Sequence, residues 1–259
     1  MTWTTRPRSE FGALRAITAG DGPTVLLIHG VGLRAEAWNA QIDAMSERFR
    51  VVAVDMPGHG QSPLLAPDSG LSEYTDAIAD GLNAPALVVG HSMGAMIVLD
   101  MAIAHPHLVR GVVALNAIFQ RDHAAAEAVQ ARANSLDGAT VADPGGTLTR
   151  WFGDASSPER DACKSWLSGV DPAGYRLAYS VFAHNNGPNP TALAALSCPP
   201  LFLTGREDPN STPAMSQAMA DLAPKGRAQI VEGAAHMLPM THVSQVNAAL
   251  LDFAQEVWT

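Results

Sequence analysis

The chain has 259 residues, of which 47% are hydrophobic and 16% are charged. This much apolar and this little charged content excludes a disordered or low-complexity protein. The 16 basic and 25 acidic residues give a formal net charge of −9, whereas a nucleic-acid-binding domain usually carries a basic surface. We therefore expect a globular protein with a sizeable core and no nucleic-acid partner.

Neither the cysteines nor the N-terminus indicates a secreted or membrane-bound protein. Cys163 and Cys198 are far apart and form no CxxC pair, which favours a reducing compartment without a disulfide framework or a thiolate metal site. Residues 1–10 contain no apolar segment typical of a signal peptide. The apolar run at residues 95–104 is interrupted by Asp100 and is shorter than the ~20 residues that a membrane span needs. We expect a soluble cytoplasmic protein with no membrane partner.

Short apolar runs alternate with helical patterns along the chain. The runs are continuous, as buried parallel strands usually are, and they lie at residues 24–29, 51–55, 86–89, 111–115, 200–204 and 228–231. An antiparallel hairpin at the sheet edge is predicted from residues 3–5 and 14–18. Apolar stripes at helical spacing include Trp38, Ile42 and Met45, and Val243, Val246, Leu250, Phe253 and Val257. The alternation predicts an α/β fold with a mostly parallel sheet and helices on both faces.

One interval breaks this alternation. The roughly eighty residues between 115 and 200 contain no clear strand and far exceed an ordinary strand-to-helix connection. They contain four helical patterns instead, at residues 123–136, 147–153, 158–167 and 172–185. We expect residues 118–195 to form a helical cap inserted into a core made of residues 1–117 and 196–259. Such a cap would cover the carboxyl edge of the sheet, where open α/β sheets bind ligands.

The segment Gly90-His-Ser-Met-Gly94 follows a predicted strand and begins a predicted helix. A bare GxSxG pattern is weak evidence, because it arises by chance in glycine-rich chains. Its position strengthens it, since a serine on a sharp strand-to-helix turn adopts a strained backbone and needs small residues two positions before and after it. Such a turn pushes the Ser92 hydroxyl out over the sheet, at a helix N-terminus that favours negative charge. The pattern indicates a nucleophilic serine; the alternative is a glycine-lined helix start without chemistry.

A second glycine-containing turn, His29-Gly-Val-Gly32, lies at the end of an earlier strand. A tetrahedral oxyanion needs two backbone N–H donors that are held ready. Met93, directly after the serine, would supply one donor and Val31 the other. Glycines at positions 30 and 32 let the backbone approach a substrate closely. Taken alone, a His-Gly pair after a strand is only a turn signal.

Together these segments resemble the α/β-hydrolase family over nearly the whole chain. The resemblance extends to Asp55-Met-Pro-Gly-His-Gly-Gln-Ser62, Thr204-Gly-Arg-Glu-Asp208 and Ala235-His236. It is highly specific for the family and weakly specific for a substrate. It implies a mostly parallel eight-stranded sheet flanked by helices, a helical cap, and a triad that runs serine, acid, histidine along the chain. Carried over to this sequence, Ser92 is the nucleophile, Asp208 the acid and His236 the base.

The order of the elements agrees with this triad, because Asp208 and His236 follow predicted strands on the side of the sheet that carries Ser92. Glu207 is a rival acid, but the family pattern places the acid directly before the proline of the following loop. His242 is a rival base, and its place at the start of the last helix indicates a surface or capping residue.

We expect neither a metal nor an organic cofactor. His105 and His107 flank a proline at a helix end, and an HxH pair alone is poor evidence for zinc. The sequence contains no HExxH motif, no GxGxxG after the first strand and no GxxxxGK[ST] phosphate loop. Asp55 and the turn at residues 57–62 fit a structural role beside the site. Serine at position 92 argues against the aspartate nucleophile of epoxide and haloalkane hydrolases.

We expect selectivity to lie in the cap and chemistry in the loops of the sheet. Trp151, Tyr175 and Tyr179 are the candidate substrate contacts; for the tyrosines the alternative is helix packing, since their spacing is typical of any buried helix. The segments at residues 150–152 and 171–175 resemble the cap of 3-oxoadipate enol-lactonases and related small carboxylesterases. That resemblance implies that an arginine such as Arg150 or Arg176 receives a substrate carboxylate; the alternative for each is a solvated surface arginine.

The sequence thus predicts a serine hydrolase that cleaves a small carboxylic ester or lactone through an acyl-enzyme intermediate, without a cofactor. Other enzymes on the same scaffold are alternatives, namely a C–C bond hydrolase of ring-cleavage products and a cofactor-free perhydrolase or haloperoxidase. A ligand-binding receptor is a further alternative. The fold alone does not separate these functions, and the sequence leaves the natural substrate and the oligomeric state open.

Overall fold

The computed structural model describes residues 3–259, and within them eight strands form one sheet. The strands are β1 (Ser9–Phe11), β2 (Leu14–Ala19), β3 (Thr24–Ile28), β4 (Arg50–Val54), β5 (Ala86–His91), β6 (Val109–Leu115), β7 (Pro200–Gly205) and β8 (Arg227–Val231). Their order across the sheet is β1-β2-β4-β3-β5-β6-β7-β8. The pairs β1–β2 and β2–β4 are antiparallel, and all the others are parallel. The predicted mostly parallel sheet is confirmed.

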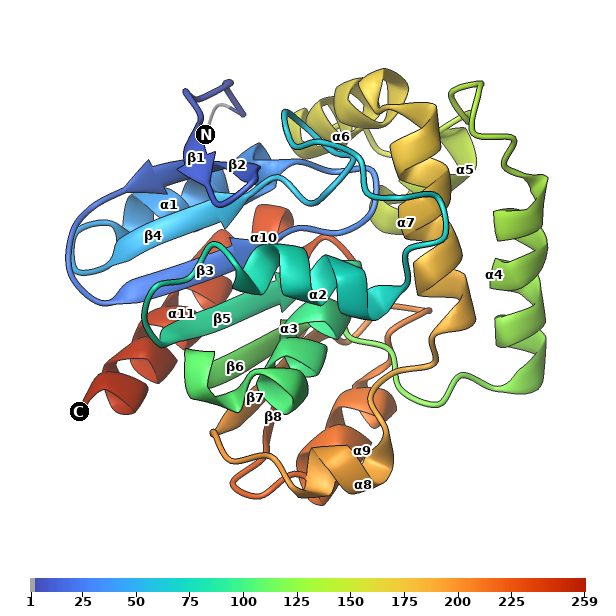
Figure 1. Cartoon of the computed structure of the whole chain (residues 1–259). Coiled ribbons are helices and arrows are strands. Elements are labelled where there is room, and N and C mark those ends of the chain that lie inside the picture. The colour runs from blue at the N-terminus through green and yellow to red at the C-terminus, as the bar shows by residue number, and fades with distance from the viewer. Residues whose placement is uncertain (1–2) are drawn as a thin grey trace.

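Helices follow most of the strands (Figure 1). The α-helices of the described residues are α1 (Asn39–Met45), α2 (Leu71–Ala79), α3 (Met93–Ala104), α4 (His123–Ser135), α5 (Gly145–Phe152), α6 (Pro158–Gly169), α7 (Pro172–His184), α8 (Pro190–Ala194), α9 (Pro213–Leu222), α10 (Leu238–Thr241) and α11 (Val243–Trp258). Short 3-10 helices lie at Ala35–Trp38 and Pro106–Leu108. Among residues 3–259, no helix combines the length and the hydropathy needed to cross a membrane.

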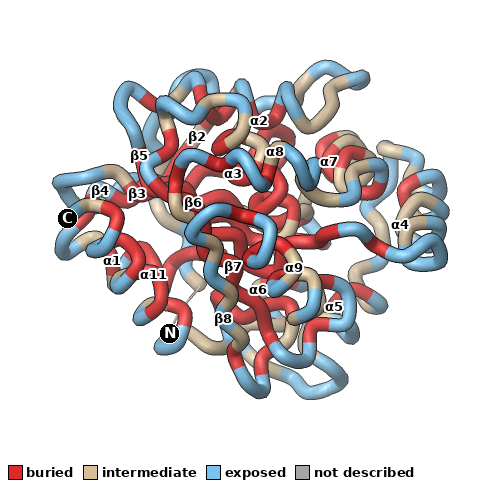
Figure 2. The backbone as a smooth tube through the Cα atoms, turned by 90° about the horizontal axis from the view of Figure 1, so that it is seen from below, coloured by how far each residue is buried: buried red, intermediate tan, exposed pale blue. Residues whose placement is uncertain are grey.

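Both faces of the sheet are buried, which explains why its central strands are continuous apolar runs. Successive side chains of a strand point to opposite faces. In β3, Leu26 and Ile28 pack into an apolar cluster with α2, α3 and α9, whereas Val25 and Leu27 pack into a second cluster with α1 and α11. The buried backbone segments accordingly gather at the centre of the molecule in Figure 2.

Helices α4, α5, α6 and α7 lie together at one end of the sheet (Figure 1). Helix α4 packs on α7, and most of its length is not buried (Figure 2). Ala133 is its one buried residue. The other three helices contribute to a third apolar cluster, in which Leu148 and Leu167 meet Leu33 and Met237. This cluster joins the helices to the loops that follow β3 and β8.

The N-terminal hairpin differs from the prediction. The strand that pairs with β2 is Ser9–Phe11, with Phe11 opposite Leu14, and residues 3–5 form no strand. The reason is the two-residue loop between the strands, whose first residue Gly12 has φ +57°. A loop this short sets the register, so the partner strand must directly precede it. Trp3 instead packs edge-on against Trp166, with ring centroids 6.4 Å apart.

A buried ion-pair network holds the N-terminal segment against the sheet. The Arg8 guanidinium donates to both carboxylate oxygens of Asp55, at 2.7 and 3.1 Å, and to both of Glu36, at 2.9 and 2.6 Å. Asp55 also accepts the backbone N–H groups of Ala35 at 2.8 Å and Gln61 at 3.0 Å. The predicted structural role of Asp55 agrees with these contacts, because its carboxylate shapes the turn after β4.

This network makes the stability of the fold sensitive to acid. Burial alone would raise the pKa of Glu36, but the hydrogen bonds and charge of Arg8 outweigh burial and hold that pKa at about 2, against 4.5 for a free glutamate. A carboxylate with a depressed pKa stabilises the folded state fully above its unfolded pKa and loses this contribution as the pH falls through the folded value. The contribution of Glu36 is therefore complete above pH 4.5 and is lost toward pH 2.

We expect E36Q to lower the free energy of unfolding at pH 7 by about 3 kcal/mol, because breaking a buried ion pair leaves a charge without its partner. Urea denaturation followed by circular dichroism measures this. The difference from the wild type should stay constant from pH 7 down to about pH 4.5 and shrink below it. The matched control is E47Q, since Glu47 is exposed. An E36Q effect that equals the E47Q effect, or that does not change with pH, would contradict the expectation.

Candidate active site

Ser92 lies on the sharp turn between β5 and α3. Its backbone is left-handed, with φ +56° and ψ −116°, which is rare for a residue with a side chain and marks strain. The flanking glycines are required, because a Cβ on Gly90 would lie 2.0 Å from the carbonyl oxygen of Gly94, and a Cβ on Gly94 would lie 2.2 Å from that of Ile28. The GxSxG pattern therefore forms the strand-to-helix elbow that the sequence predicts.

Asp208 and His236 meet beside this elbow, although they lie on the loops after β7 and β8. The distance between His236 Nδ1 and Asp208 Oδ2 is 2.7 Å, and both residues are buried. Glu207, the rival acid, is exposed. His242, the rival base, caps no helix through its side chain, and its ring contacts the Thr241 hydroxyl. The structure thus places Asp208, and not Glu207, against His236.

Asp208 is held as a carboxylate despite its burial. Its Oδ1 accepts the backbone N–H groups of Asn210 at 2.9 Å and Ser211 at 3.1 Å. Burial alone would raise the pKa of Asp208, but the charge and hydrogen bond of His236 together with these two N–H groups hold it at about 2. The carboxylate can therefore orient the imidazole and stabilise a positive charge on it across the physiological pH range.

Two further residues support this pair, and the sequence analysis assigned neither of them a role. The Asn116 side chain donates to Asp208 Oδ2 at 2.7 Å, from a buried position with φ +49° directly after β6. His91 Nε2 contacts the carbonyl oxygen of His236 at 2.8 Å. Burial, with the neighbouring His236, lowers the pKa of His91 to about 3, so this ring is neutral and donates to the carbonyl. For Asn116 the only sequence signal is a polar residue at the end of an apolar strand.

The loop after β3 passes directly beside Ser92. A Cβ on Gly30 would lie 3.1 Å from the Ser92 Cβ, so a side chain at this position would crowd the serine. Gly32 follows Val31 in this loop, and its backbone N–H donates to His59 Nε2 at 3.0 Å. This hydrogen bond fixes the loop. Met93 is the first residue of α3, so its own N–H has no partner within the helix. Val31 and Met93 therefore flank Ser92 on two independent backbone segments.

A cavity of about 390 Å³ lies above these residues and is lined by Ser92, His236, Val31 and residues of α4, α5 and α7. This volume suits a small molecule. The predicted substrate contacts Trp151, Tyr175 and Tyr179 all line it. The tyrosines also pack against each other, because Tyr175 is 7% exposed and its ring stacks on that of Tyr179 with centroids 5.8 Å apart. Contact with a substrate stays a prediction.

The cavity wall carries three arginines. Arg150 lines the cavity, as the enol-lactonase resemblance implies, whereas Arg176 does not and instead lies against Gly138. Arg121 and Arg132 were not anticipated, and they line the same cavity. Both are far from the sequence motifs, and no local pattern marks them.

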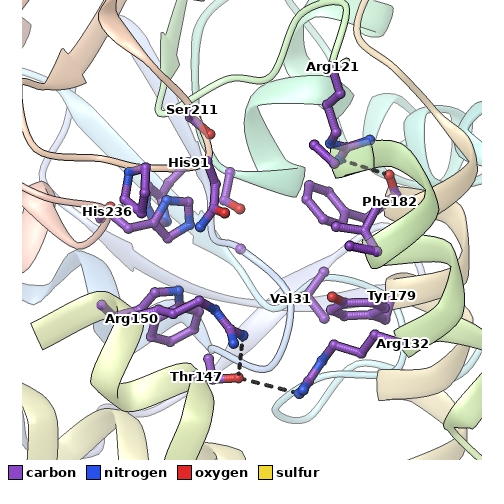
Figure 3. A pocket seen from close by; sticks show the side chains of 18 of the residues that line it. Val31, His91, Arg121, Arg132, Thr147, Arg150, Tyr179, Phe182, Ser211 and His236 are labelled. Carbon is purple, nitrogen blue, oxygen red and sulfur yellow. Dashed lines mark hydrogen bonds between the residues drawn. The ribbon is translucent and has the colours of Figure 1, made fainter. Parts of the chain in front are cut away.

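Two of these arginines converge on one hydroxyl. Arg132 and Arg150 both donate to Thr147 Oγ1, at 3.3 and 3.2 Å. Figure 3 shows them reaching Thr147 from different sides, with Arg121 across the cavity. No ion pair among residues 3–259 uses any of the three. Asp122 also lines the cavity, but its carboxylate accepts the N–H of Ala125 at the start of α4.

Arg121 is the most buried of the three, at 8% exposed. Its guanidinium donates to the carbonyl oxygens of Asn185 at 2.9 Å and Phe182 at 3.2 Å, and it lies 4.4 Å from the centre of the Phe182 ring. Burial lowers the pKa of Arg121 to about 10, which still leaves it charged at neutral pH. The wall therefore presents three guanidinium groups and the single carboxylate of Asp122, and its net charge is positive. Among the described residues, no cluster of histidine, cysteine and carboxylate groups could hold a metal ion.

Comparison with known proteins agrees with this architecture. A family model described as "Alpha/beta hydrolase family" matches residues 25–249. The (E)-2-((N-methylformamido)methylene)succinate hydrolase of Acinetobacter baylyi is 38% identical over 237 residues, which cover 89% of this chain and 90% of that protein. A pimeloyl-[acyl-carrier protein] methyl ester esterase of Methylococcus capsulatus is 41% identical over 98 residues, or 38% of each chain.

Solved structures share the whole fold. A thermophilic esterase from Thermogutta terrifontis superposes with a TM-score of 0.86 at 24% identity, covering 98% of this chain and 100% of that one. The enol-lactonase of Burkholderia xenovorans superposes with a TM-score of 0.81 at 22% identity, covering 95% and 99%. At these identities the superpositions show the fold alone, whereas the family model and the Acinetobacter relative extend over most of the sequence. The chain belongs to the alpha/beta hydrolase family.

Proposed function

We propose that this protein is a serine hydrolase that cleaves a carboxylic ester or lactone of a small, negatively charged acid. Ser92 is the nucleophile, His236 the general base and Asp208 the acid that orients it. The observation that carries the proposal is the juxtaposition in one cavity of a strained serine with a buried His–Asp pair at 2.7 Å. Nucleophile, base and orienting acid are the three roles that acyl transfer requires.

The reaction follows in two steps. His236 Nε2 takes the Ser92 proton while Ser92 Oγ attacks the carbonyl carbon, and the imidazolium then gives this proton to the departing alkoxide. The product of this step is an acyl ester on Ser92. In the second step His236 takes a proton from water, the hydroxide attacks the acyl carbon, and the proton returns to Ser92 as the free acid leaves.

Val31 and Met93 are proposed to donate their backbone N–H groups to the oxyanion of each tetrahedral intermediate. The support is their position beside Ser92: Met93 directly follows it in the chain, and Val31 directly follows Gly30, which lies against the Ser92 side chain. The Gly32–His59 hydrogen bond braces the Val31 loop. Donors fixed before the reaction need no reorganisation when charge develops, which makes them effective.

The charge of the cavity supports a substrate with one or two carboxylates. Arg132 and Arg150 share one hydroxyl acceptor, so a carboxylate placed between them would satisfy both guanidinium groups. Arg121 offers a second positive pole across the cavity. The Acinetobacter relative is named a hydrolase of a methylene succinate, and a succinate carries two carboxylates. We also propose that residues 118–195 act as a cap that supplies these charges to the core formed by residues 1–117 and 196–259.

A second candidate is hydrolysis of an N-acylated methylene succinate, which the name of the same relative favours. A panel that combines p-nitrophenyl esters, lactones, vinylogous diketones and the relative's substrate, together with a halide-oxidation assay with peroxide, separates the candidates. Turnover of esters or lactones supports the first proposal, and turnover of the N-acyl compound alone supports the second. Turnover only of vinylogous diketones indicates C–C bond hydrolysis, halide oxidation with peroxide indicates a haloperoxidase, and binding without turnover indicates a receptor.

We expect S92A and H236A each to lower kcat by roughly 10⁴-fold or more, and the double variant to be scarcely worse, because residues that act as a unit lose their effect together. Steady-state kinetics on the best ester of the panel measures this. Losses that multiply in the double variant would contradict a shared mechanism.

Variants of two adjacent residues test the assignment of Asp208 as the acid of the triad. D208N should be severely impaired, because Asp208 contacts His236, whereas E207Q should retain activity, because Glu207 is exposed. Circular dichroism confirms that both variants are folded. If E207Q proves the more damaging change, the assignment of the acid is wrong.

Charge recognition is tested with two esters of equal chain length, mono-4-nitrophenyl adipate and 4-nitrophenyl hexanoate. We expect R150Q and R132Q to lower kcat/KM for the adipate by roughly ten- to a hundredfold, the value of a charged hydrogen bond, and to change the hexanoate little. R176Q is the control, since Arg176 lies outside the cavity lining. Equal losses on both esters would show that these arginines do not recognise a carboxylate.

A further inference from the structure

Trp151 makes a contact that substrate binding does not explain. Its ring stacks on the His236 imidazole, with centroids 5.7 Å apart and planes inclined by 25°. Trp151 belongs to α5, in the helical segment, whereas His236 follows β8. The two are brought together because Leu148 of α5 and Met237 share the third apolar cluster. This contact is inconsistent with a strict separation of chemistry from the cap.

The other contacts of His236 leave the plane of its ring weakly defined. Asp208 holds Nδ1 at 2.7 Å, and His91 holds the backbone carbonyl at 2.8 Å. The torsion between Cβ and the ring of a histidine is intrinsically broad. A hydrogen bond at one ring atom limits this rotation only partly, whereas a stacked aromatic face restricts the tilt of the whole ring. His91 also approaches the ring, at 5.0 Å between centroids, but its plane is inclined by 52°.

The stacked indole also affects the positive charge that His236 carries during the reaction. When His236 accepts the serine proton it becomes an imidazolium, which lies over the face of an indole. Tryptophan has the strongest cation–π attraction of the aromatic side chains, and this attraction grows where water is excluded. The His236 side chain is 7% exposed. The neighbours Asp208, His91 and Trp151 therefore provide a counter-charge, a neutral brace and an electron-rich face.

We infer that Trp151 is a positioning residue for His236. Its indole restricts the tilt of the imidazole ring, and it stabilises the imidazolium that forms while Ser92 attacks. This inference rests on the proposed function of His236 as base. It assigns to the helical segment a part in the chemical step, in addition to selectivity.

Labelling by a fluorophosphonate isolates this step. Ser92 Oγ forms a bond to phosphorus, the phosphorus–fluorine bond breaks, fluoride leaves, and the serine proton passes to His236. The probe carries no carboxylate, so the arginines do not contribute to its recognition. Its second-order rate constant therefore reports nucleophile, base and oxyanion donors, and a residue that only forms the pocket wall has little influence on it.

We expect W151L to slow labelling roughly three- to thirtyfold, and to lower kcat for 4-nitrophenyl acetate by a similar factor with little change in KM. W151F should recover most of the rate, because it retains an aromatic face. F152L is the matched control, since Phe152 is the next residue of α5 and does not line the cavity. A W151L variant that labels at the wild-type rate while KM rises would overturn the inference.

Should W151L fail to fold, fluorinated tryptophans introduced at position 151 decide the question. Each added fluorine weakens the negative face of the indole with little change in its shape. We expect the logarithm of the labelling rate constant to fall stepwise with fluorine number; a constant rate would overturn the inference. Failure of the proposed function has a different signature, namely no labelling of the wild type or labelling that persists in S92A.

Discussion

The left-handed backbone at Ser92 is the constraint to which the rest of the site is fitted. A serine with φ +56° is tolerated only because the surrounding chain leaves no other arrangement. Gly90 and Gly94 pack against each other's backbone, Gly94 packs against the end of β3, and Gly30 packs against Ser92 itself. The strain is offset by the packing of β3, β5 and α3 in the sheet core. The elbow thus fixes the β3 loop and the start of α3 relative to one serine.

Histidines brace this arrangement, and their burial determines their protonation. His29 accepts the N–H of Met56 at 3.0 Å through Nε2, and His59 accepts the N–H of Gly32 in the same way. Burial lowers the pKa of His29, and of His91, to about 3. These rings are therefore neutral hydrogen-bonding groups at neutral pH. His236 differs from these rings in having a buried carboxylate at Nδ1, as its proposed role of general base requires.

The sequence predicts what is encoded locally and misses what depends on distant contacts. The strands and the elbow at Ser92 follow from apolar runs and glycine spacing. The pairing of Asp208 with His236 came from the family resemblance, and the order of the elements agrees with it. The short strand before Gly12 was misplaced because the two-residue turn, and not apolar content, sets its register. Asn116 and Arg121 carry no motif, since their importance arises only when segments far apart in sequence converge on one cavity.

The helical segment is packed into the site, so selectivity and chemistry cannot be cleanly divided between it and the sheet. A Cβ on Gly32 would lie 2.4 Å from Leu167 and 2.9 Å from Tyr175, and a Cβ on Gly174 would lie 2.2 Å from the carbonyl oxygen of Gly58. Helices α6 and α7 therefore press on the loop that carries the proposed oxyanion donor. A substitution in these helices that changes the pocket also moves this loop, because close-packed interiors transmit displacement. Helix α4 packs on α7 but buries only Ala133, so it is less constrained than α6 and α7, and it contributes Arg132 to the cavity wall. The proposed charge recognition can accordingly vary at Arg132 with less effect on the loop beside Ser92 than a substitution in α6 or α7 would have.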